Sequence, residues 1–92
     1  MKVLPSKEYL ISKLITNFSK PNVEKIYLIL DKNIFCVNVI MEPNSFHIIA
    51  NLIELEEVIT NGDHTRVKFL YIEDDQDFLK DDLIWQSSKE MS

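Results

Sequence analysis

The order of apolar and polar positions predicts a helix near the start of the chain. Its apolar residues recur at helical spacing and form one stripe: Leu10, Ile11, Leu14, Ile15 and Phe18. Ser6 is placed to cap the first turn of this helix. Pro21 ends it, because residues before a proline avoid helical backbone angles.

The next two apolar segments, residues 23–30 and 34–41, predict a β-hairpin around Asp31, Lys32 and Asn33. We expect Leu30 to lie opposite Ile34 across this polar turn. Both faces of the hairpin are then apolar over their middle. One face can take the N-terminal helix, and the other needs a second helix, a second sheet or a second subunit.

Residues 46–60 fit two patterns. As a helix they offer Ile48, Leu52, Leu55 and Ile59 at a spacing of four, three and four. As a strand they lie between two turn sequences, the second of which contains an Asn-Gly pair, a strong hairpin signal. The chain holds 18 Ile and Val residues against a single Ala, and β-branched residues favour sheets. We therefore favour the strand.

Residues 66–72 alternate as a strand, and the acids that follow suit the entry to a short C-terminal helix that carries Phe78, Leu79, Leu83 and Trp85. The predicted fold is a small α+β domain spanning residues 1–92. It has an antiparallel sheet meander flanked by an N-terminal and a C-terminal helix, in the order α-β-β-β-β-α. If residues 46–60 are helical, the order becomes α-β-β-α-β-α.

Charge is distributed unevenly along the chain. The formal net charge is −5, and residues 1–72 carry eight acids and eight bases. The last twenty residues carry seven acids and two lysines, so they account for the whole imbalance. This excess of acids argues against nucleic acid as a direct ligand, because phosphate contacts need a basic surface, and it suits a basic protein partner. No apolar run is long enough for a bilayer or for a secretory signal, so we expect a cytoplasmic protein without membrane contact.

The residues that most often carry chemistry form no recognised motif. Cys36 is the single cysteine, and His47 and His64 lie seventeen positions apart without the paired spacing of a zinc site. The C-terminal aspartates lack the glycine and the distal glutamate of a calcium loop. We expect no catalytic residue, no metal site and no cofactor.

These features predict a small non-enzymatic binding protein. We expect an inhibitor of the immunity or antitoxin type that blocks a basic, nucleic-acid-processing protein such as a nuclease toxin. Its contact residues would be acids and the aromatic residues near them: Glu54, Glu56, Glu57, Tyr71, Asp74, Asp75, Asp77, Phe78, Asp81, Asp82 and Trp85. The alternative is a structural or accessory subunit that forms a homodimer through an apolar face of its sheet.

Overall fold

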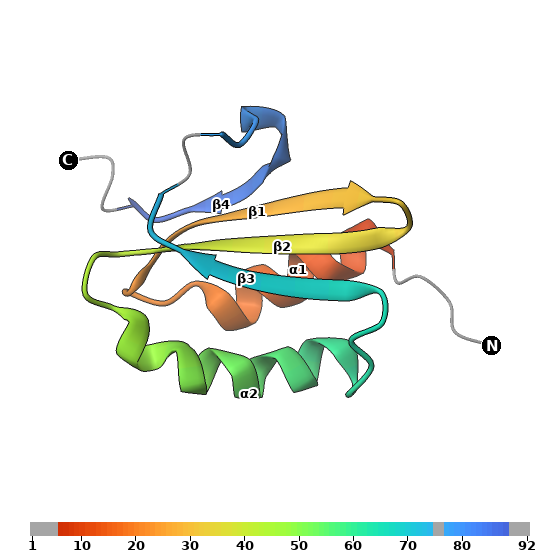
Figure 1. The fold of residues 1–92 in the computed structure, drawn as a ribbon, viewed down its shortest axis with the longest axis horizontal. Helices are drawn as coiled ribbons and strands as arrows, with labels where there is room; N and C mark the ends of the chain where they lie inside the picture. Colours follow the sequence, from red (N-terminus) through yellow and green to blue (C-terminus); the bar gives the residue numbers. More distant parts are fainter. Residues whose placement is uncertain (1–5, 75–76, 89–92) are drawn as a thin grey trace.

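The computed structural model describes residues 6–74 and 77–88, which form an α+β fold with one four-stranded sheet (Figure 1). The elements in chain order are α1 (Lys7–Phe18), β1 (Val23–Asp31), β2 (Ile34–Met41), the 3₁₀ turn η1 (Phe46–Ile48), α2 (Ile49–Thr60), β3 (Val67–Ile72), the 3₁₀ turn η2 (Lys80–Asp82) and β4 (Leu83–Gln86). The strands lie in the order β3-β2-β1-β4. The predicted α+β class is confirmed. The antiparallel meander is wrong, because β2 and β3 pair in parallel.

Helix α1 forms as the sequence predicts. The Ser6 hydroxyl oxygen accepts a hydrogen bond from the Tyr9 backbone N–H at 3.1 Å, which satisfies one free donor of the first turn. Leu10, Leu14 and Phe18 are fully buried against the sheet. The Phe18 ring stacks on the ring of Phe69, which fixes the end of α1 on β3.

The β1–β2 hairpin forms, but its register differs by one residue from the prediction. The turn contains only Lys32 and Asn33, whose φ angles of 52° and 67° are the positive pair that a type I′ turn requires. Asp31 therefore pairs with Ile34, and Leu30 pairs with Phe35. A shift of one residue moves every side chain of a strand to the opposite face.

This register separates the two faces of the sheet. Phe35, Val37 and Val39 join the buried core beneath the helices. The alternate positions of β2, Cys36 and Asn38, lie on the opposite face. We call that opposite face the open face, and its residues in the three neighbouring strands include Tyr27, Ile29, Cys36, Asn38, Lys68 and Leu70.

Residues 46–60 are helical rather than extended, so the strand prediction for this segment is wrong. Their apolar stripe places Leu52 and Ile59 in the core. Asn61 and Gly62, which the sequence predicts to form a hairpin turn, have φ angles of 55° and 80°. They end α2 in the left-handed conformation. A crossover segment is also what two parallel strands need, and α2 supplies it between β2 and β3.

Both helices pack on the same face of the sheet, and α1 lies behind the strands in Figure 1. One apolar cluster joins helices and sheet: Leu10, Leu14, Phe18, Val23, Ile26, Leu28, Phe35, Val37, Val39, Met41, Leu52, Ile59 and Val67. No helix in the described part of the chain has the length and apolar character needed to cross a bilayer.

The predicted C-terminal helix does not form. Residues 77–82 contain only the 3₁₀ turn η2, and β4 then pairs antiparallel with β1, with Trp85 opposite Ile26. The Ser87 backbone N–H extends this pairing by donating to the Glu24 carbonyl at 2.8 Å. Asp82 interrupts the apolar stripe that a helix would need, whereas an added strand satisfies the backbone groups along the free edge of β1.

Candidate partner-binding surfaces

The predicted contact residues fall on two separate surfaces. Glu54, Glu56 and Glu57 belong to α2, which runs along the lower edge of Figure 1. The C-terminal acids belong to the blue segment that leads into β4 at the top of the same view. The fold therefore does not bring the two acidic groups together, and each surface has to be considered by itself.

On α2 the three glutamates have different environments. Glu54 and Glu57 are exposed, whereas Glu56 is only 8% exposed. The Tyr71 hydroxyl donates a hydrogen bond to Oε2 of Glu56, and Nδ1 of His64 lies 3.8 Å from Oε1. Glu56 and Tyr71, both predicted to meet a partner, are thus engaged with each other inside the protein.

The Tyr71 hydroxyl keeps its proton in this environment. Burial is the main cause that raises the pKa of Tyr71 well above its ordinary value, and the hydrogen bond to Glu56 and the charge of Glu56 add to it. A neutral phenol in contact with a carboxylate is a stable donor–acceptor pair. This pair fixes α2 to β3 by a polar contact at the margin of the core.

His64 extends the pair into a small polar cluster at the C-terminal end of α2. Its Nε2 atom lies 3.3 Å from Oε1 of Glu57 and 3.5 Å from the Thr60 hydroxyl. The Thr60 hydroxyl also donates to the Glu56 carbonyl oxygen at 2.8 Å. These contacts hold the loop between α2 and β3 against the end of the helix, which is a structural role.

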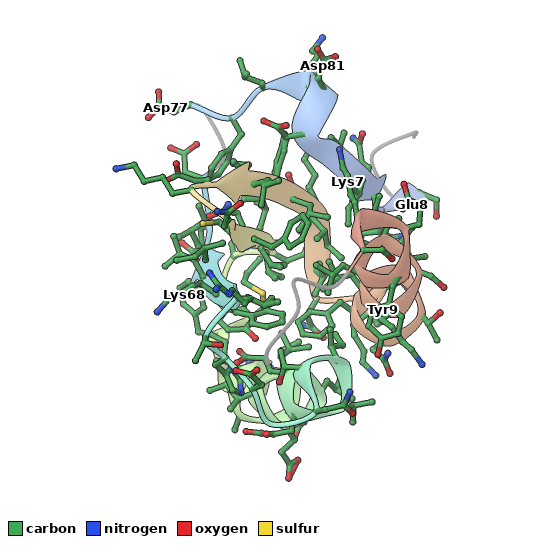
Figure 2. The ribbon with its side chains drawn as sticks, turned by 90° about the vertical axis from the view of Figure 1, so that its right-hand side faces the viewer. Lys7, Glu8, Tyr9, Lys68, Asp77 and Asp81 are labelled. Atoms are coloured by element: carbon green, nitrogen blue, oxygen red, sulfur yellow. The ribbon has the colours of Figure 1, made fainter. Side chains whose placement is uncertain are left out.

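The second surface is the acidic segment, which we define as the described residues 73–74 and 77–82. Glu73, Asp74, Asp77 and Asp81 are exposed, and Asp82 is half-buried. Asp75, another predicted contact residue, lies outside the described residues. Figure 2 shows Asp77 and Asp81 pointing outward from this segment, on the side of the molecule opposite α2. The segment therefore presents several carboxylates to solvent within one stretch of chain.

Two aromatic residues predicted to meet a partner make contacts within the protein. The Phe78 ring stacks on Tyr27 of β1, with the ring centroids 4.9 Å apart and the planes 30° apart. Trp85 is half-buried and packs against the core from β4. Both side chains attach the C-terminal part of the chain to the sheet.

The exposed apolar residue of the acidic segment is Leu79, which is not among the predicted contact residues. At 69% exposed, it is the most exposed large apolar side chain among the described residues. In an extended chain, neighbouring side chains point to opposite sides. A Phe-Leu pair in an extended segment therefore turns one residue inward and the other outward, but the sequence alone does not say which.

No group of three His, Cys, Asp or Glu side chains among the described residues is placed to hold a metal ion. Among the described residues, a hollow of about 410 Å³ lies on the open face near Cys36, and another of about 640 Å³ lies between α2 and residues 20–22.

Comparisons with protein-family models, with curated proteins and with solved structures each found no match. The assignment of function therefore rests on the two acidic surfaces and on the open face of the sheet.

Proposed function

We propose that this protein is a small acidic binding protein without enzymatic activity, which blocks a basic surface on a nucleic-acid-processing protein. Inhibitors, immunity proteins and antitoxins directed against nucleases act in this way. The observation that carries the proposal is the acidic segment, in which the exposed Asp77 and Asp81 lie two positions before and after the exposed Leu79.

The acidic segment suits a basic partner for electrostatic reasons. A surface that binds nucleic acid must be basic in order to contact phosphates. A row of carboxylates offers the same partner an alternative set of charge-assisted hydrogen bonds. An inhibitor bound in this way excludes the nucleic acid by occupying its binding surface.

The anchoring of the segment adds to the argument. Phe78 holds the segment on Tyr27, so the positions of Asp77 and Asp81 are set before a partner arrives. Preorganised groups lose less conformational entropy on binding than groups on an unattached tail. The exposed Leu79 then supplies an apolar contact beside these acids, and protein interfaces commonly combine apolar and charged contacts.

Affinity capture from a lysate of the native cells tests this proposal with two matched double variants. Asp77→Asn with Asp81→Asn removes two charges from the acidic segment, and Glu54→Gln with Glu57→Gln removes the charges of the two exposed acids of α2. Each double variant removes two negative charges from exposed positions. We expect the wild type and the α2 variant to capture the same basic protein, and the Asp77/Asp81 variant to lose it.

Two results would contradict the proposal. In the first, the captured protein remains bound after neutralisation of Asp77 and Asp81. In the second, both double variants lose it equally, which would mean that only total charge matters. Addition of the purified wild-type protein should also inhibit the captured protein's binding to nucleic acid, and the Asp77/Asp81 variant should not.

A further inference from the structure

The described residues cover the open face along one side and leave Leu70 exposed on the other. Near β1 and β4, Phe78 lies over Tyr27, which is only 4% exposed. Near β2 and β3, Leu70 is 54% exposed. The hollow of about 410 Å³ lies at β2, β3 and the hairpin turn, and its lining includes Ile34, Cys36, Asn38 and Leu70. The open face therefore carries an apolar depression next to the part that Phe78 covers.

Charged residues of both signs lie near this depression. Lys68 of β3 lines it, together with Asp31 and Lys32 at the hairpin turn. Phe78 attaches the acidic segment to Tyr27 of the same face. Figure 2 shows Asp77 and Lys68 projecting from the same flank of the molecule, Asp77 above and Lys68 below.

Such a face is complementary to itself. A two-fold axis parallel to the face, between Lys68 and Asp77, places Lys68 of each copy against Asp77 of the other. The acidic segment of one copy then lies against the depression of the other, so that the exposed side chains of Leu79 and Leu70 are removed from water together. We infer that the open face binds a second copy of this chain in a two-fold dimer.

This inference does not rest on the proposed function, because it concerns the protein alone. If the dimer forms and the proposed function is correct, the two have a regulatory consequence, because the second copy and a basic partner would both contact Asp77. Each would then exclude the other, and binding of the partner would release the monomer.

Sedimentation velocity over a concentration series from about 1 to about 500 µM tests the dimer on the full chain. We expect reversible dimerisation of the wild type. Leu70→Asp should abolish it, because the substitution places a charge in the apolar centre of the interface. Leu30→Asp is the matched control, since Leu30 is equally exposed, at 54%, but lies at the hairpin end of the helix-covered face.

Charge reversal gives a second test that does not depend on the apolar centre. Lys68→Glu and Asp77→Lys, each alone, create two like-charge contacts per dimer and should each weaken association at least about tenfold. An equimolar mixture of the two variants should restore it, because each contact in the mixed dimer again joins one acid and one base. Circular dichroism should show all variants folded.

Three results would overturn the inference. A wild-type monomer throughout the series would leave the open face to another occupant, either a different protein or a small apolar ligand. Equal loss of association in Leu70→Asp and Leu30→Asp would remove the open face from the interface. Failure of the mixed charge variants to associate would remove the pairing of Lys68 with Asp77. None of these results would bear on the capture of a basic partner.

Discussion

The Phe78 ring stacks on the Tyr27 ring at a centroid distance of 4.9 Å, and this contact joins the acidic segment to the centre of the sheet. Tyr27 belongs to β1, the strand that pairs with both β2 and β4. The most acidic part of the chain is thus attached to an interior strand by an aromatic contact. A flexible acidic tail would lack this attachment and would lose more entropy on binding.

Phe78→Ala should lower the free energy of unfolding by about 1–2 kcal/mol, which is less than the cost for a fully buried Phe because the side chain is half-buried. Amide exchange in η2 should speed up in the variant, since the segment loses its anchor. Urea unfolding and hydrogen exchange provide the measurements. Leu79→Ala is the control, and a loss of stability in that variant as large as in Phe78→Ala would argue against the anchoring role.

Tyr71→Phe should destabilise the protein by about 1–3 kcal/mol at neutral pH. The substitution removes the hydroxyl that donates to the buried Glu56 carboxylate and leaves that acceptor with a weaker set of partners. Denaturant unfolding measures the change. Tyr9→Phe, at an exposed tyrosine on α1, should change stability by less than about 0.5 kcal/mol. Equal effects of the two substitutions would mean that the Tyr71–Glu56 contact contributes nothing specific.

The same hydroxyl predicts how stability depends on alkaline pH. Because the pKa of Tyr71 is raised in the folded protein, the folded state keeps this proton at pH values where the unfolded chain loses it. Its contribution to stability is fully present below about pH 10, the ordinary tyrosine pKa, and is lost as the pH rises further. The stability difference between wild type and Tyr71→Phe should therefore shrink above about pH 10. A constant difference between about pH 8 and about pH 11 would contradict this prediction.

The hairpin turn offers a test of the observed register. Asn33 has a φ angle of 67°, where Gly and Asn are tolerated and a β-branched residue is strained. Asn33→Gly should keep or slightly raise stability, whereas Asn33→Val should lower it by about 1–2 kcal/mol. Thermal unfolding of both variants measures the difference. Equal stability of the two variants would contradict the positive φ angle of Asn33.

Helix α1 and the first three strands could be predicted from the sequence because their signals are local. The stripe from Leu10 to Phe18 and the alternation in β3 need no knowledge of distant residues. The structure of residues 46–60 could not be predicted from local signals. Asn61 and Gly62 serve equally well in a hairpin turn and at a helix C-terminus, and the choice depends on the parallel pairing of β2 with β3.

The last strand could not be predicted for a similar reason. β4 is short and exists through its pairing with β1, as in the contact of Trp85 with Ile26. The position of charge could be predicted, because the number of acids in a segment does not depend on the fold. The separation of the α2 acids from the acidic segment, the burial of Glu56 and the inward turn of Phe78 all depend on tertiary structure.

The central claim is that exposed acids bring this protein to a basic partner, and the association rate with the captured protein tests it most directly. Stopped-flow measurements should be made from about 50 to about 500 mM salt, a range over which the screening length shortens severalfold. We predict that the association rate falls by about tenfold or more while the dissociation rate changes much less. An association rate that is indifferent to salt would contradict the claim.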